Sequence, residues 1–257
     1  TSWTNSSADI RPASTASRLT DGNFQPSVTA DGRTIAFSSN RNLTADNADL
    51  SGEIFVYKVQ EKLLIQLTSD TIEHAAVSPK ISGDGARVYY KRMSTANPAV
   101  ADLVSIETAT ATARVVAADV PELSLVEGRA VSNDGMRVAY SALTAPNQSQ
   151  VFLFDGRDNS IRQLTQLGSR VTDVRLLPTI SGDGRRVACA TRRRVTTATD
   201  GGVELYVLDL PTGQVQQITN ATATATGEVV ASLNFDGSVS AFSFPRILSG
   251  SVSDDDL

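Results

Sequence analysis

"PTISGDGRRVACA", from Pro178 to Ala190, decides the fold because the chain contains several versions of it. "PKISGDGARVYY" begins at Pro79, "PSVTADGRTIAF" at Pro26 and "AVSNDGMRVAY" at Ala130. A fifth, looser version surrounds Asp236, and the Asp residues of successive versions are 53, 50, 49 and 53 positions apart. A repeated unit of about 50 residues therefore organises the chain.

The Asp–Gly pair of each unit predicts a tight turn between two strands. Glycine adopts the positive φ that such a turn needs, and the Asp side chain accepts hydrogen bonds from the amides of the turn. A Pro is tolerated at the start of the preceding strand, because its missing N–H is not needed for strand pairing there. We therefore interpret the pairs as structural rather than catalytic; they are Asp31, Gly32, Asp84, Gly85, Asp134, Gly135, Asp183, Gly184, Asp236 and Gly237.

Each of the first four units continues with two more short apolar runs. The third run begins at Glu53, Ala101, Gln150 or Glu204, and the fourth ends at Thr68, Ala117, Thr165 or Thr219. These runs are rich in Val, Ile and aromatic residues and are bounded by turn residues, so they predict strands. Four antiparallel strands in each unit, repeated along the chain, are typical of an all-β propeller.

The ends of the chain predict how the propeller closes. The last unit stops at DDDL after its second strand, while TASRLT, ending at Thr20, copies the signature of a fourth strand. We expect five four-stranded blades, closed by pairing of N- and C-terminal strands, in a single domain over residues 1–257. The alternative is a fragment of a propeller with six or more blades.

Composition narrows the classes of chemistry. The net charge of −5 disfavours nucleic-acid binding, and no apolar stretch reaches the length of a membrane span. The chain has one cysteine and one histidine, and it has neither a G-x-S-x-G elbow nor a phosphate-binding glycine loop. These observations exclude an internal disulfide and a His-cluster metal site. We expect no cofactor and no resident metal.

The repeat resembles that of the TolB-type bacterial β-propellers. The resemblance rests on P-x-[IV]-[ST]-x-D-G, on a third strand such as IFVYK and on a closing QLT, and it extends over nearly the whole chain. It implies a periplasmic or extracellular bacterial protein that binds other macromolecules. The spacing of about 50 residues exceeds the roughly 40–45 of comparable propeller blades, so the partners of that family are not carried over.

The opposite end of each unit is the expected binding face, because the connections there differ from copy to copy. The longest span Ser39–Glu53, Lys91–Asp102 and Thr191–Glu204. The innermost strands should begin at this face, around the mouth of a central channel. Their first polar residues are the candidate binding site; they are Asn23, Glu73, His74, Glu127, Asp173, Arg175 and Glu228.

Two functions are compatible with these features of the sequence. The first is a non-enzymatic module of an exported bacterial protein that presents the connection-rich face and channel mouth to a protein partner. It follows from a repeat without a complete catalytic set. The second is a five-bladed enzyme related to glycoside hydrolases, in which two carboxylates among Glu73, Glu127, Asp173 and Glu228 act as acid and base.

Three smaller features favour ordinary structural roles. Asn47-x-Asp49-x-Ser51 has the alternation of a calcium loop, but Lys58 stands where the closing Glu of such a loop belongs. The basic run at residues 192–194 is interpreted as a solvated loop. Cys189 occupies a column otherwise held by Phe or Tyr, so we expect a buried and unreactive thiol.

Overall fold

The computed structural model describes residues 22–126, 128–167, 176–193, 200–220 and 229–243, and all regular structure within them is β-strand. Since these residues form no helix, none of them forms a helix long and apolar enough to cross a membrane. The chain divides into two compact units, Thr1–Asp119 and Val120–Leu257.

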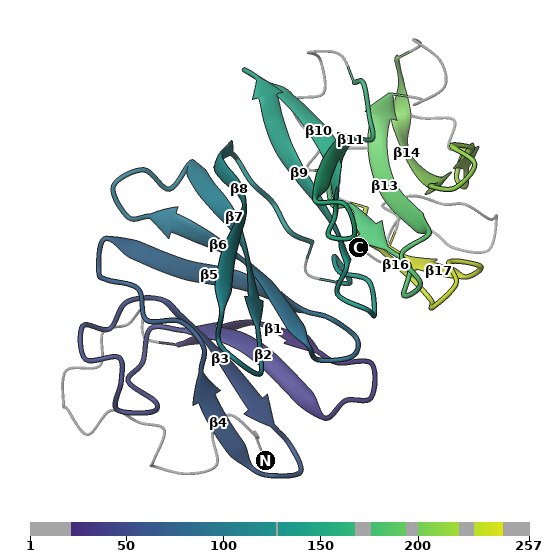
Figure 1. Cartoon of the computed structure of the whole chain (residues 1–257). Helices are drawn as coiled ribbons and strands as arrows, with labels where there is room; N and C mark the ends of the chain where they lie inside the picture. The colour runs from purple at the N-terminus through teal and green to yellow at the C-terminus, as the bar shows by residue number, and fades with distance from the viewer. Residues whose placement is uncertain (1–21, 127, 168–175, 194–199, 221–228, 244–257) are drawn as a thin grey trace, which may run out of the picture. The chain divides into compact units, whose positions relative to one another are not determined.

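The first unit holds two four-stranded antiparallel sheets (Figure 1). Their strands follow one another in chain order, each hydrogen-bonded to the next. The first sheet contains β1 (Asn23–Val28), β2 (Thr34–Ser39), β3 (Glu53–Lys58) and β4 (Leu63–Gln66). The second sheet contains β5 (His74–Ile81), β6 (Arg87–Ser94), β7 (Val100–Glu107) and β8 (Ala113–Pro121), which ends just past the boundary between the units.

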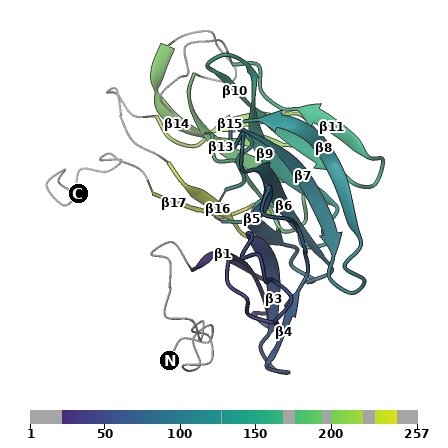
Figure 2. The same cartoon turned by 90° about the vertical axis from the view of Figure 1, so that its left-hand side faces the viewer.

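The second unit holds three further antiparallel sheets. The third sheet contains β9 (Arg137–Ala145), β10 (Gln148–Asp155) and β11 (Ser160–Gln163). The fourth contains β12 (Thr179–Ile180), β13 (Arg186–Arg193), β14 (Asp200–Asp209) and β15 (Val215–Gln217). The fifth is the hairpin of β16 (Ala231–Leu233) and β17 (Ser240–Phe242), drawn in yellow in Figure 2.

The predicted all-β architecture of antiparallel sheets, four-stranded where complete, is confirmed. The innermost run of the third sheet differs, because it pairs with β9 only through isolated bridges at Ser124–Ser141 and Val131–Val138. The fifth sheet has two strands within the described residues. Residues 1–20, which we expect to complete it, lie outside the described part of the chain.

The Asp–Gly pairs lie in tight turns with nearly the same geometry in every copy. In the fourth sheet the Ser181 hydroxyl donates to Asp183 Oδ1 at 2.6 Å, and the same oxygen accepts the Arg185 amide at 2.9 Å. Gly184 has φ +72°, and the five turn glycines all lie between +64° and +76°. The positive φ favours glycine because a side chain there would contact the following carbonyl.

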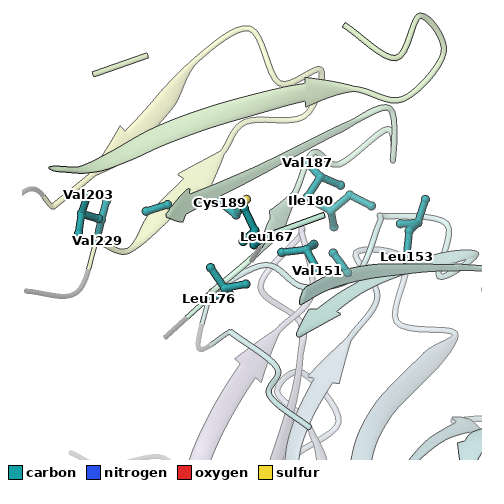
Figure 3. Close-up of a cluster of buried hydrophobic side chains, with 11 residues drawn as sticks. Val151, Leu153, Leu167, Leu176, Ile180, Val187, Cys189, Val203 and Val229 are labelled. Carbon is teal, nitrogen blue, oxygen red and sulfur yellow. The ribbon is translucent and has the colours of Figure 1, made fainter. Parts of the chain in front are cut away.

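Side chains of alternate strand residues build the core of each unit. In the first unit Ile54 and Val56 of β3 pack in one buried cluster with Val88 and Tyr90 of β6. In the second unit the cluster in Figure 3 joins Val151 and Leu153 of β10 to side chains from the fourth sheet. Their burial is the main stabilising contribution to each unit.

Cys189 belongs to this second cluster, as expected for a buried filler. Burial raises the pKa of its thiol to about 12, because the thiolate would lose its hydration. The thiol is therefore protonated at neutral pH and is a poor nucleophile.

A second repeated contact joins the third and fourth strands at the end opposite the Asp–Gly turns. The Thr165 hydroxyl donates to Gln150 Oε1 at 2.6 Å and accepts the Val151 amide at 2.9 Å. Thr219 makes the corresponding bonds to Glu204 Oε2 and the Leu205 amide. Both acceptor side chains are almost completely buried. We call this contact the strand clasp.

The first sheet has the same strand clasp with a carboxyl group. Thr68 donates to Glu53 Oε2, and the Asp70 amide donates to Glu53 Oε1 at 2.7 Å. Burial raises the pKa of Glu53, although these donors oppose the shift. The second sheet departs from the pattern, because Asp102 pairs with Arg92 at 2.7 Å and Ala117 replaces the threonine.

Two of the three long loops predicted from the sequence, Lys91–Asp102 and Thr191–Glu204, are largely strand instead. β6 and β7 continue into the span 91–102, where Met93 pairs with Ala101. Likewise β13 and β14 extend into 191–204, so Arg193 lies in a strand rather than in a loop. Backbone pairing does not require apolar side chains, so the ladder continues through these polar ends. Of the three predicted loops, Asn40–Gly52 alone is a connection without strands along its whole length.

Candidate functional site

The structure describes three of the seven residues in the predicted binding set. Asn23 is the first residue of β1, His74 is the first of β5, and Glu73 is exposed just before it. Glu127, Asp173, Arg175 and Glu228 lie outside the described residues. The grouping of all seven around one channel mouth therefore stays a prediction.

A pocket of about 280 Å³ opens between the first and second sheets, next to His74. It lies at the end of the sheets where β1 and β5 begin and where the Asn40–Gly52 connection runs. Its lining is formed by Phe24, Ser38, Ser39, Asn40, Leu50, Ser51, Gly52, Ile72, His74, Ala75, Val77 and Thr95. We call this space the first-unit pocket.

The Asn40–Gly52 connection forms one wall and is fixed at both ends. Asn40 Oδ1 accepts the Gly22 amide at 3.0 Å, and the Gly52 carbonyl accepts the Ala76 amide of β5 at 2.7 Å. A Cβ on Gly52 would lie 3.2 Å from the Ala75 Cβ, so the connection and β5 approach closely here. These contacts hold the wall in place before a ligand arrives.

Hydrogen bonds within the connection also account for the calcium-like alternation. The buried Asn47 donates through Nδ2 to the Ser51 carbonyl at 2.8 Å, and Asp49 Oδ1 accepts the Ser51 amide at 3.2 Å. The hydroxyl of Ser51 lies 2.7 Å from Glu53 Oε1. In the described part of the chain, no three His, Cys, Asp or Glu side chains form a group that could hold a metal.

Apolar side chains border the entrance of the first-unit pocket. Phe24 is 46% exposed and Ile72 is 61% exposed, although both are large and apolar. The Ile72 carbonyl accepts the Thr95 hydroxyl at 3.2 Å, which fixes the backbone on that side. Exposed apolar side chains beside a concave surface are typical of a ligand site.

Polar atoms around the pocket limit its chemistry. The Ser38 and Ser39 hydroxyls donate to the carbonyls of Phe24 and Gly22 at 3.3 and 2.9 Å. Nearby, Asn23 Oδ1 is buried and has no hydrogen-bond partner among the described residues. Among the described residues of the lining, His74 is the one titratable side chain and there is no carboxylate. The arrangement can therefore bind an apolar group and offer it a few polar contacts.

The pocket was not predicted from the sequence. His74 was selected because it begins an innermost strand, whereas Phe24, Leu50 and Ile72 were not singled out for binding. A usable signal was present in Ile72, an apolar residue in the largely polar connection between the first and second sheets, "SDTIEHA". The convergence of residues from five segments carries no local sequence pattern.

No family model matches the chain, and no curated protein matches it. Solved structures do. TolB from Acinetobacter baumannii has a TM-score of 0.53 and 17% identity, over 86% of this chain and 51% of that chain. The β-propeller domain of the Trilobed protease from Pyrococcus furiosus has a TM-score of 0.52 and 11% identity, over 85% and 62%. A prolyl endopeptidase structure has a TM-score of 0.58 and 10% identity, over 82% and 31%.

These likenesses confirm the resemblance to TolB and related β-propellers at the level of the fold. The chain spans about half the length of the Acinetobacter TolB structure. At such low identities they show the fold alone.

The expected function is corrected by the same comparisons. Structures that share this fold include a prolyl endopeptidase and a protease propeller domain as well as TolB, so the repeat does not imply a non-enzymatic module. The prediction drawn from a missing catalytic set was wrong, because the fold also occurs as part of enzymes: the likeness covers 31% of the prolyl endopeptidase chain, and another match is one domain of a protease. The glycoside hydrolase alternative has no support among these structures either.

Proposed function

We propose that this chain binds polypeptide, and that the first-unit pocket takes an apolar side chain of the bound segment. The observation that carries the proposal is a pocket of about 280 Å³ bordered by the exposed side chains of Phe24 and Ile72. The proposal applies equally to a separate binding protein and to a domain attached to a catalytic one.

The size of the pocket favours a side chain over a complete small molecule. Small-molecule sites usually enclose roughly 300–1,000 Å³, and the first-unit pocket lies just below that range. Burial of a leucine or phenylalanine side chain contributes about 1.5–3 kcal/mol. The pocket alone therefore gives weak affinity, and neighbouring contacts along the polypeptide would supply the rest.

The comparisons support the same ligand class from two directions. The TolB-type resemblance implies binding of other macromolecules, and the prolyl endopeptidase and the Trilobed protease are named for action on polypeptides. Polypeptide is the ligand class that the two enzyme names share, and it is one class of macromolecule. We further propose, on the TolB resemblance, that the chain works in the periplasm or outside the cell.

We also propose that residues 1–257 form one five-bladed domain whose fifth sheet is completed by N-terminal strands. A groove of about 720 Å³ lies where β14, β15 and β17 meet, beside the sheet that has two described strands. Deletion of Thr1–Thr20 should then expose a sheet edge and cause aggregation or non-cooperative unfolding. A truncated protein that stays monomeric and melts as sharply as the parent would overturn this closure.

Side-chain binding is tested by titrating the protein with N-acetyl-leucinamide and N-acetyl-phenylalaninamide, followed by NMR. We expect saturable shifts of the Gly52, His74 and Thr95 amides, with N-acetyl-alaninamide much weaker. Ile72→Ser should weaken binding severalfold, since it removes apolar contact area at the entrance.

Ile161→Ser is the matched control, because Ile161 is 43% exposed on β11 and lies outside the pocket lining. Its affinity should equal that of the parent protein. Equal losses in the two variants, or equal affinities for the leucine and alanine derivatives, would contradict the proposal.

A further inference from the structure

Arg129 stands at a position where three of the five copies have a proline and the fifth has Ala231. Five residues before the Asp of the turn, the first, second and fourth copies have Pro26, Pro79 and Pro178. The third copy has Arg129 there. A residue that breaks a structural pattern without an evident structural gain is a candidate for function.

The backbone of Arg129 is anchored to the next sheet. Its carbonyl accepts the Ile180 amide at 3.0 Å and the Thr179 hydroxyl at 2.8 Å. The guanidinium is fixed as well, because Nη1 donates to Asn133 Oδ1 at 2.8 Å. Both ends of the residue are therefore held within the second unit.

Gly182 provides the space that the guanidinium occupies. A Cβ on Gly182 would lie 2.5 Å from Arg129 Nη1 and 2.7 Å from Phe235 Cδ2, distances that real Cβ atoms essentially never show. A larger residue would displace the guanidinium. Phe235, the other neighbour of this space, is 60% exposed and gives the site an apolar wall.

The charge of Arg129 is not neutralised by its described surroundings. No carboxylate within the described ranges forms an ion pair with it, whereas Arg137, Arg157 and Arg186 each pair with an Asp. Arg129 is half-buried, and its burial lowers the pKa of the guanidinium. A partly desolvated cation with free N–H donors gains from an anion that takes the place of water.

We propose that Arg129, positioned by Asn133 and Gly182, binds a carboxylate. The planar guanidinium matches the two oxygens of a carboxylate through paired hydrogen bonds. A single cation favours this monoanion over a phosphate, because phosphate carries about −1.5 to −2 charges at neutral pH. The site lies in the second unit and does not depend on the first-unit pocket.

The site is tested with acetate, with an acetylated tripeptide that has a free C-terminal carboxylate, and with the same tripeptide amidated. The readouts are the Arg129 Nε–Hε signal and the Asn133 and Gly182 amide signals by NMR. We expect saturable shifts with acetate and the free tripeptide, and none with the amide. Tighter binding of the free tripeptide than of acetate would assign the carboxylate to a polypeptide end, and equal binding would assign it to small carboxylates.

Arg129→Met should weaken carboxylate binding at least about tenfold, because it removes paired charge-assisted hydrogen bonds. Arg157→Met is the control, since Arg157 is exposed and already paired with Asp134 at 2.8 Å. Amide spectra of both variants report whether they remain folded. If Arg129→Met does not fold, Arg129→Lys is used in its place. Loss of binding in the control alone, preference for inorganic phosphate, or no saturable shift at Arg129 would overturn the proposal.

Discussion

The two ends of the sheets follow different rules. At the Asp–Gly end, a hydroxyl two residues before the Asp donates to Oδ1 at 2.5–2.7 Å in four copies. At the opposite end, the connections between strands differ in length from sheet to sheet. Asn40–Gly52 is a long irregular loop, whereas β9 and β10 are joined by a two-residue turn at Pro146–Asn147. The repeated turns serve the fold, whereas the end with unlike connections, which we call the unrepeated end although it also carries the strand clasp, holds the first-unit pocket.

The fifth copy shows how strictly the first end is maintained. There Asn234 replaces the Ser or Thr, and its Oδ1 accepts the Val239 amide at 3.1 Å. In the second copy the Ser82 hydroxyl accepts the equivalent Arg87 amide at 3.0 Å. Asn234 has no hydroxyl to donate to Asp236, and the Ser238 hydroxyl donates to Asp236 Oδ1 at 2.6 Å instead. Different side chains therefore satisfy the same groups of the turn.

The largest effect is expected from breaking a turn. Gly184→Val places a β-branched residue at φ +72°, with its Cβ 3.2 Å from Arg137 Cδ and Ser132 Cβ. The free energy of unfolding should fall by at least about 1–2 kcal/mol, measured by urea denaturation. Ligand binding per folded molecule should stay normal. An unchanged free energy of unfolding would remove the structural assignment of the turn.

A smaller, pH-dependent effect is expected at the strand clasp. Glu53→Gln gives the first sheet the side chain that the third sheet already has in Gln150. The raised pKa of Glu53 means that the folded state holds its proton more tightly than the unfolded state. Its contribution to stability is therefore full below the unfolded pKa and is lost as pH rises through the folded value.

Glu53→Gln removes this loss, so the stability of the variant relative to the parent should increase as pH rises from acidic to neutral. The expected gain is about 1 kcal/mol or less. Gln150→Glu is the matched reversal and should show the opposite trend in urea titrations at several pH values. Parallel pH profiles for the parent and both variants would show that the carboxyl is not perturbed.

The smallest effect on stability is expected at the unrepeated end. Ile72→Ser should change the free energy of unfolding by less than about 0.5 kcal/mol, because Ile72 is 61% exposed. Thermal melting measures this directly. A large destabilisation would mean that the connection contributes to the fold and would weaken the contrast between the two ends.

The sequence predicted the repeated end better than the unrepeated one. An Asp–Gly pair such as Asp183–Gly184 favours a turn in any surroundings. The regular spacing of these pairs along the chain is therefore sufficient to place the strands on either side of each turn. The strand clasp was missed, although Glu53–Thr68, Gln150–Thr165 and Glu204–Thr219 share one spacing of 15 residues. Aligning the polar residues at strand ends, rather than the apolar ones, would have revealed it.

The candidate sites were harder to predict for physical reasons. Phe24, Leu50 and Ile72 meet only because two sheets lie side by side and a loop is fixed against β5, and this convergence leaves no local pattern. Polar stretches of strand such as Lys91–Arg92 resemble loops in the sequence, because a hydrogen-bonded ladder does not require apolar side chains. The sequence shows that Arg129 replaces a proline of the repeat. Only the structure shows that Gly182 leaves the space that the guanidinium occupies.

The most direct test of the central claim is to locate the bound side chain. Intermolecular NOEs should be recorded between N-acetyl-phenylalaninamide and the methyl groups of the protein under saturating conditions. Ring protons of the ligand should contact the methyl groups of Leu50, Ile72 and Val77, all of which line the first-unit pocket. Saturable binding whose NOEs fall only on methyl groups outside this lining would contradict the account.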